Sequence, residues 1–287
     1  MSKLRKMASG SAALLMAVSW ALLARDDPKR YELIVPPAEI LAGPKIYLAP
    51  TSVLQKYAPC GNQAVDSYLA ESQESWQGEI ARQIRERFGK KKITAELVEI
   101  PPPDFEAKLS SALKLRAIGG FFSPDTGRLD EKLYDSIMTE LAKQYGGGLF
   151  APRLIQKKVE VKQLWTHETA PKAKWDGVSR KVEKGGFIGH HDESIEGTMV
   201  PVLSLHVDGY GVNGKTFWAD GGFDVLLYLK YSPVNLLGGA ALGGAAMPGS
   251  LGHNQEKGCD AGKLLGPQND NHKNEAIKLA FEPLFSK

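Results

Sequence analysis

The sequence predicts an α+β fold with a mixed, largely antiparallel sheet and helices packed mainly on one face. Apolar residues recur at every fourth position in the first half of the chain and again near its end, which is typical of amphipathic helices. Between about residues 155 and 229 they alternate with polar residues, which is typical of strands. With 287 residues, 43% of them hydrophobic, the chain can bury a sizeable core, and its composition is not that of a disordered protein.

The first half of the domain is expected to alternate strands with helices. In the first long helix Trp76, Ile80 and Ile84 fall on one face. Gly89 is expected to end this helix, and Gly146 is expected to end the helix at about 129–145, because glycine readily takes the left-handed conformation found at helix C-termini. The expected elements are, in order, a strand at 46–49, a helix at 66–88, a strand at 93–100, a weaker helix at about 105–115 and a helix at about 129–145.

The second half is expected to be mostly strands. Asn213-Gly214 indicates a tight hairpin, because such a turn needs positive φ at both central positions. Gly221-Gly222 interrupts the returning strand and indicates a bulge or a point of close packing. We expect a single domain at 45–287 that carries a Gly/Ala-rich insert at 231–272. Its remaining elements are strands at 155–161, 199–207 and 215–229 and a final helix at 273–285.

Residues 1–24 have the pattern of a signal peptide. Basic residues at its start precede a short stretch rich in Ala, Ser and Leu, with small residues at a possible cleavage point. A stable transmembrane helix needs ~20 strongly apolar residues, and this stretch falls below that. An uncleaved N-terminal anchor is the alternative. The charged, proline-containing residues 25–44 are interpreted as a tether. The first cysteine is Cys60, so a lipidated cysteine directly after the signal is not expected.

The charge balance does not favour a nucleic-acid partner. The chain has 36 Lys and Arg against 33 Asp and Glu, a formal net charge of +3. The three extra basic groups are Lys3, Arg5 and Lys6, so the chain after residue 24 is neutral. A nucleic-acid-binding domain would need a basic surplus.

Cys60 and Cys259 are expected to form a disulfide in an oxidising compartment. Both lie in loop-like sequences far apart in the chain. Two unpaired thiols are an alternative. A nucleophilic Cys60 is the weakest reading, because no basic residue beside it would lower its pKa.

His190, His191, Asp192 and His206 are the candidate metal ligands. Two imidazoles and a carboxylate could form a zinc-type site, which would make the chain a metal-dependent hydrolase. Adjacent histidines in an extended segment point in opposite directions, so both cannot bind one ion without a turn. The sequence also lacks the H-E-x-x-H spacing that places two ligands on one face of a helix. A polar loop explains the cluster equally well. We expect no metal or cofactor, and the glycine-rich segments lack the context of a phosphate-binding loop.

Two segments are candidates for contact with a partner. Residues 236–251 have no charge and consist of small and apolar residues, so they could pack against a partner or a membrane, or form a flexible loop. Two tryptophans in a polar connection could lie at an interface or fold back over the sheet as a lid. The candidate contacts are Leu236, Leu237, Leu242, Met247, Trp165 and Trp175.

The order of elements resembles the small α/β domain of a group of bacterial envelope proteins: the TolB amino-terminal domain, the curli secretion lipoprotein and the penicillin-binding-protein activator LpoB. The chain departs from them in its missing lipidation cysteine and in the insert at 231–272. The resemblance implies binding rather than catalysis and transfers no site residue. It is carried by Lys45–Pro50, the helix through Trp76, Gly147–Pro152, Pro201–Val207, Asn213-Gly214 and Ala280–Leu284.

These observations lead to one main functional expectation and two alternatives. The main one is an exported, non-catalytic periplasmic accessory protein that binds an envelope protein through an exposed strand edge or the 231–272 insert. The alternatives are the metal-dependent hydrolase and a membrane-contacting or pore component that uses 236–251.

Overall fold

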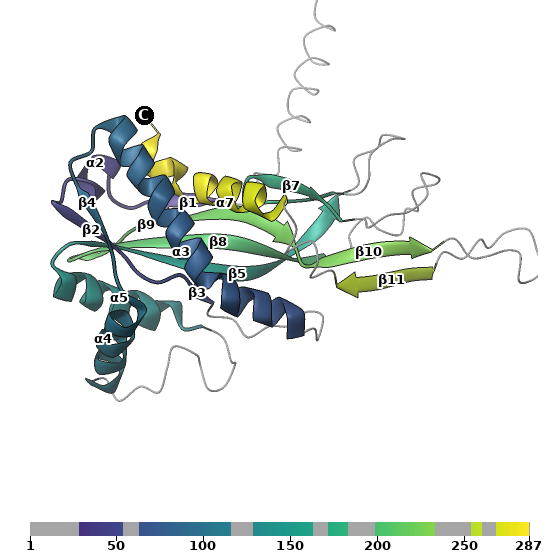
Figure 1. Ribbon diagram of the computed structural model, residues 1–287, viewed down its shortest axis with the longest axis horizontal. Coiled ribbons are helices and arrows are strands. Elements are labelled where there is room, and N and C mark those ends of the chain that lie inside the picture. Colours follow the sequence, from purple (N-terminus) through teal and green to yellow (C-terminus); the bar gives the residue numbers. More distant parts are fainter. Residues whose placement is uncertain are drawn as a thin grey trace, which may run out of the picture. The chain divides into compact units, whose positions relative to one another are not determined.

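The computed structural model describes residues 29–53, 63–115, 129–162, 172–182, 199–232, 254–259 and 268–286 (Figure 1). The chain divides into two units, Met1–Arg30 and Tyr31–Lys287. Of the first unit only Lys29 and Arg30 are described, and every helix and strand that the structure describes belongs to the second. The second unit has the α+β fold that the sequence predicts.

A mixed, largely antiparallel sheet forms the centre of this unit. Its strand order is β1-β9-β8-β5-β2-β4. β2 lies parallel to β4 and β5, whereas β5 pairs antiparallel with β8, β8 with β9, and β9 with β1. The bounds are β1 Tyr31–Leu33, β2 Lys45–Leu48, β4 Glu96–Glu99, β5 Gly148–Lys162, β8 Met199–Gly211 and β9 Gly214–Val225.

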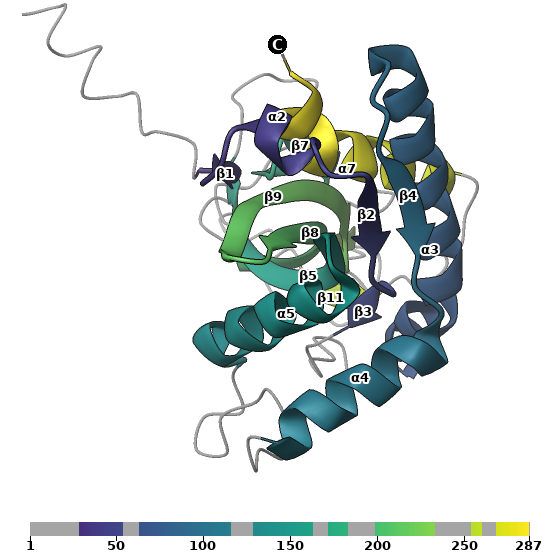
Figure 2. The same cartoon turned by 90° about the vertical axis from the view of Figure 1, so that its left-hand side faces the viewer.

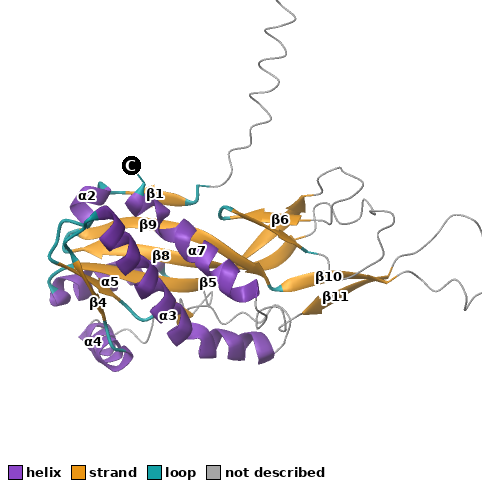
Figure 3. Cartoon of the chain, turned by 45° about the horizontal axis from the view of Figure 1, so that its top comes forward, coloured by secondary structure: helices purple, strands orange, loops and turns teal. Residues whose placement is uncertain are grey.

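Five further strands complete the β structure of the described residues. β3 (Ser52–Val53) pairs with β5, and β6 (Lys172–Trp175) forms a hairpin with β7 (Val178–Lys181) that joins the sheet at the end of β5. β10 (Leu227–Ser232) and β11 (Asn254–Cys259) form a separate antiparallel ribbon (Figure 3). The expected insert at 231–272 therefore begins and ends within regular structure.

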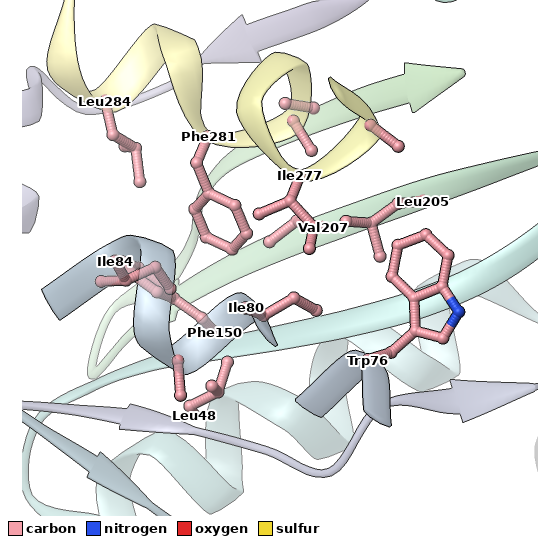
Figure 4. Close-up of a cluster of buried hydrophobic side chains, with 14 of the residues drawn as sticks. Leu48, Trp76, Ile80, Ile84, Phe150, Leu205, Val207, Ile277, Phe281 and Leu284 are labelled. Carbon is pink, nitrogen blue, oxygen red and sulfur yellow. The ribbon is translucent and has the colours of Figure 1, made fainter. Parts of the chain in front are cut away.

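Helices cover both faces of the sheet (Figure 2). α3 (Gln63–Lys91) and α7 (Gln268–Phe285) pack on one face, where Trp76, Ile80 and Phe281 meet Phe150 and Val207 (Figure 4). α4 (Pro102–Leu115) and α5 (Glu131–Tyr145) pack on the other face, beside Leu149, Ala151 and Tyr210. The expectation of helices mainly on one face is wrong, because apolar side chains point alternately to both sides of β2 and β5.

The helix spacing is confirmed, but one of the two expected helix ends is wrong. Trp76, Ile80 and Ile84 are fully buried. α5 ends as expected at Gly146, which has φ of 73°. α3 instead continues through Gly89 to Lys91, and Lys92 takes the left-handed conformation with φ of 56°.

Residues 31–44 belong to the domain. β1 pairs with β9, α2 (Pro37–Ile40) follows, and the side chain of Ile40 is buried in the core beneath α3 and α7. The interpretation of 25–44 as a tether is therefore wrong from residue 31 onward. The apolar side chains of Leu33, Val35 and Leu41 are partly buried and pack against this core, which explains why the segment folds onto the sheet.

The glycine predictions in β8 and β9 are largely confirmed. The hairpin forms with Gly211 opposite Gly214, but positive φ occurs at Gly214 and not at Asn213. The register shifts by one residue next to Gly222, as a bulge requires. A Cβ atom on Gly221 would lie 2.0 Å from the carbonyl oxygen of Ala276, so this glycine allows α7 to pack closely against β9.

Candidate functional site

A chain of charged side chains crosses the face of the sheet that bears α5. We call it the charged strip and define it by Arg153 and Lys157 of β5, His206 and Asp208 of β8, and Asp220 of β9. His206 is directly opposite both Arg153 and Asp220 in the strand register, so the sheet itself brings these groups together. α5 packs beside Tyr210 at one end of the strip, and the β6–β7 hairpin lies over Ser204 at the other.

His206 is at the centre of the strip, and each of its ring nitrogens faces a carboxylate. Nδ1 lies 2.6 Å from Oδ1 of Asp220 and Nε2 lies 3.0 Å from Oδ1 of Asp208. A neutral imidazole has a single N–H and satisfies only one of these carboxylates, whereas the imidazolium satisfies both. Burial lowers the pKa of His206, but Asp208 and Asp220 outweigh it, so the pKa lies above its ordinary value.

Asp208 joins the strip to its cationic neighbours. Its side chain is fully buried, and its carboxylate accepts hydrogen bonds from Arg153 Nη2 at 2.6 Å and forms an ion pair with Lys215 Nζ at 2.7 Å. Burial alone would raise the pKa of Asp208, but His206, Arg153 and Lys215 hold it far below its usual range. Arg153 also reaches Glu131 on α5 and lies over the ring of Tyr134.

Lys157 and Asp176 connect the other end of the strip to the β6–β7 hairpin. Lys157 Nζ donates to Asp220 at 2.7 Å and to Asp176 at 2.8 Å. Asp176, in the turn between β6 and β7, also accepts a hydrogen bond of 2.7 Å from Ser204 Oγ. Trp175 Nε1 donates to Ser204 Oγ at 3.1 Å, so the hairpin is fastened to β8 by polar as well as apolar contacts.

The strip reaches the surface beside α5. Lys215 Nζ and the Tyr210 hydroxyl both donate to Oδ1 of Asp135, at 3.0 and 2.6 Å. Asp135 and Lys215 line an open groove of about 620 Å³ between α5 and the β8–β9 hairpin, together with Thr139 and Lys143. The buried charges are thus linked by hydrogen bonds to a solvent-accessible surface.

The two ring nitrogens of His206 are both directed at carboxylates of the strip. A histidine that acts as general base or metal ligand needs one nitrogen directed at the reacting atom or the ion. Both nitrogens of His206 face carboxylates instead, and the metal-dependent alternative stays a prediction. The described residues contain no cluster of three or more His, Cys, Asp or Glu arranged for a metal, and His190, His191 and Asp192 lie outside them.

Trp175 is not an exposed partner contact. Its side chain is buried in a third apolar cluster with Val178, Val202 and Val225. The alternative interpretation, an aromatic residue folded back over the sheet, is confirmed for Trp175. The other candidate contacts, Trp165, Leu236, Leu237, Leu242 and Met247, lie outside the described residues.

The disulfide between Cys60 and Cys259 stays a prediction. Cys259 is the last residue of β11 and pairs with Leu227 of β10 in the register. Cys60 lies outside the described residues.

His206 was singled out from the sequence, but none of its partners in the charged strip was. Arg153 lies between Pro152 and Leu154 and Asp220 between Ala219 and Gly221, and this placement was the available signal, whereas Lys157 lies between the polar residues Gln156 and Lys158. The placement did not reveal the register that aligns the three strands.

In the described part of the chain, no helix combines the length and apolar character needed to cross a membrane. No protein-family model, curated protein or solved structure matches this chain.

Proposed function

We propose that the chain is an exported, non-catalytic accessory protein of a bacterial envelope complex that acts by binding another protein. The signal-like residues 1–24 and the resemblance to envelope accessory proteins support export and the envelope setting. The engagement of both His206 nitrogens by carboxylates supports a role other than acid–base chemistry at the charged strip.

The observation that carries the binding role is the exposed edge of the sheet at β1. Among the described strands, β1 is the last of the sheet on that side, and its pairing partner is β9. Tyr31 is 42% exposed and Ile34, just after the strand, is 54% exposed. An edge strand with apolar side chains can accept a strand from a partner, with main-chain hydrogen bonds and side-chain pockets supplying the contacts.

The opposite edge, β4, is protected by charge. Glu96 and Glu99 stand at its two ends and pair with Lys45 and Arg85. Charged side chains on an edge strand disfavour pairing with another chain. We therefore assign the partner to β1 and not to β4.

Site-specific photocrosslinking tests this assignment. A photoreactive amino acid is placed at Tyr31 in the full chain, produced in cells, and the captured protein is identified by mass spectrometry. The matched control carries the same amino acid at Glu96. We expect one dominant envelope protein captured from Tyr31 and not from Glu96. Equal capture from both positions, or no specific product from Tyr31, would contradict the proposal.

A second candidate, contact with a membrane through 236–251, is favoured by the β10–β11 ribbon. Ser232 pairs with Asn254, so residues 233–253 connect two paired strands. This connection contains no Asp, Glu, Lys or Arg. A closed, uncharged segment of small and apolar residues can enter the interfacial region of a bilayer.

Liposome flotation of the full chain and of a chain lacking 236–251 tests this candidate. Membrane contact through the segment predicts that the full chain floats with the vesicles and the deletion does not. If neither chain floats, or if both do, this candidate is removed.

A further inference from the structure

A groove with a local surplus of positive charge lies between α3 and α7 on the outer surface of the domain. The two helices lie side by side (Figures 1 and 3) and are joined across the groove floor by a hydrogen bond of 2.9 Å from Gln83 Nε2 to Asn274 Oδ1. The groove has a volume of about 520 Å³. We call it the α3–α7 groove, and its lining is Arg82, Gln83, Glu86, Arg87, Lys90, Asn274, Glu275 and Lys278.

The two carboxylates of the groove are already neutralised. Glu86 pairs with Arg82, which also pairs with Glu79. Glu275 pairs with Arg180 of β7 at 2.7 Å. The negative charge of the groove is therefore compensated by arginines before any ligand is present.

Three cations of the groove are not compensated in the same way. Across the described residues, Arg87, Lys90 and Lys278 take part in no ion pair. Lys90 and Lys278 are exposed, one on each wall, and Arg87 is partly buried between them.

Arg87 is the most informative of the three. Its guanidinium donates to the Lys278 carbonyl oxygen at 3.3 Å and lies over the ring of Phe285. Burial lowers the pKa of Arg87, and the negative charge of Glu282 only partly opposes this. A cation that has lost water without gaining a carboxylate is stabilised by an anion that enters the groove.

We propose that the α3–α7 groove binds an acidic peptide segment of the partner protein. This inference rests on the proposed binding function and adds the chemistry of the recognised segment. Carboxylates of such a segment meet Arg87, Lys90 and Lys278, while its backbone N–H groups meet the oxygens of Gln83 and Glu86. β1 and α2 both contact α7, so the groove and the β1 edge lie on neighbouring elements of the domain.

The groove fits a peptide better than an anionic membrane surface. Its cations line a concavity between two helices, whereas a lipid surface binds a protruding apolar and basic face. The carboxylates of Glu86 and Glu275 can accept hydrogen bonds from the backbone N–H groups of a peptide.

Direct binding of a defined probe tests the inference. Fluorescently labelled poly-L-glutamate is titrated with the purified full chain at low and moderate salt, and binding is followed by anisotropy. The test variant is Lys90→Glu/Lys278→Glu. The matched control is Lys114→Glu/Lys132→Glu, which makes the same change in net charge at exposed positions of α4 and α5. We expect the groove variant to bind about tenfold more weakly than the control at low salt, with the difference shrinking as salt is added.

Three results would overturn the inference. They are equal affinity of the two variants, no binding of poly-L-glutamate by the unchanged chain, and binding to vesicles of anionic lipid in place of poly-L-glutamate. Circular dichroism of both variants shows that they are folded. The binding of poly-L-glutamate and the capture of a partner from Tyr31 are separate measurements. Failure of poly-L-glutamate binding would therefore overturn the groove inference without deciding the proposal that β1 binds a partner.

Discussion

The imidazole of His206 and the carboxylate of Asp220 share a hydrogen bond of 2.6 Å, and a second carboxylate, Asp208, faces the other nitrogen of the same ring. The side chain of His206 is 14% exposed. Trp218 stacks on the ring, with its centroid 6.0 Å away, and donates from its own Nε1 to Glu32 of β1. The contacts of His206 and of the Trp218 ring stacked on it therefore link β8, β9 and the edge strand β1.

Stability is expected to be highest in mildly acidic solution. The pKa of folded His206 lies above its ordinary value of 6.5, so protonated His206 stabilises the fold fully below that pH. This contribution is lost as the pH rises through the folded-state pKa. The pKa values of Asp208 and Asp220 lie below 3.8, so their contribution is present above that pH and is lost as the pH falls further.

Urea unfolding at about pH 5.5 and about pH 8.5 measures this effect. The unchanged chain should have the larger free energy of unfolding at the lower pH. His206→Asn should reduce the difference, because asparagine does not titrate. Greater stability of the unchanged chain at about pH 8.5 would contradict the assigned charge state of His206.

Removal of Asp208 should destabilise the fold strongly. Asp208→Ala leaves Arg153 buried without its strongest partner, and such a loss costs about 3–5 kcal/mol. Asp270→Ala is the matched control, since Asp270 is 79% exposed and pairs with Lys273 at 3.4 Å, so its loss should cost below about 0.5 kcal/mol. Equal effects of the two substitutions in denaturant unfolding would show that the strip contributes little to stability.

The positions of the helices and strands could be predicted because they depend on the local spacing of apolar residues. Trp76, Ile80 and Ile84 are buried as their four-residue spacing predicts, and the glycine that ends α5 has the expected conformation. The end of α3 was mispredicted because the helix ends where Lys92, and not Gly89, takes the left-handed conformation.

The charged strip could be predicted only in part because it depends on strand register. His206 and Asp208 are two residues apart, so their shared face follows from the strand period. Arg153 and Asp208 are 55 positions apart, and only the pairing of β5 with β8 brings them together. Trp175 was equally ambiguous, since its burial depends on the β6–β7 hairpin folding onto Gly222 and Ser204.

Gly221→Ala should destabilise the chain because α7 packs directly on this residue. The new methyl group would lie 2.0 Å from a backbone oxygen of α7, which cannot rotate away as a side chain would. We expect a loss of about 3 kcal/mol or more in the free energy of unfolding. Gly78→Ala is the control: it lies within α3 with nothing within 4 Å of the added atom, and it should stabilise by about 0.5–1 kcal/mol. If Gly221→Ala is neutral, α7 does not lie as close to β9 as described.

Substitution of Trp175 separates its apolar from its polar role in holding the β6–β7 hairpin. Trp175→Ala removes a large buried side chain from the third apolar cluster and should cost about 3–5 kcal/mol. Trp175→Phe keeps much of the ring but loses the hydrogen bond to Ser204, which should add a loss of about 1 kcal/mol to a smaller packing defect. Hydrogen exchange of the β6–β7 amides locates the effect. Faster exchange confined to the hairpin would show that Trp175 fastens it to the sheet, and unchanged exchange in Trp175→Ala would show that other contacts hold it.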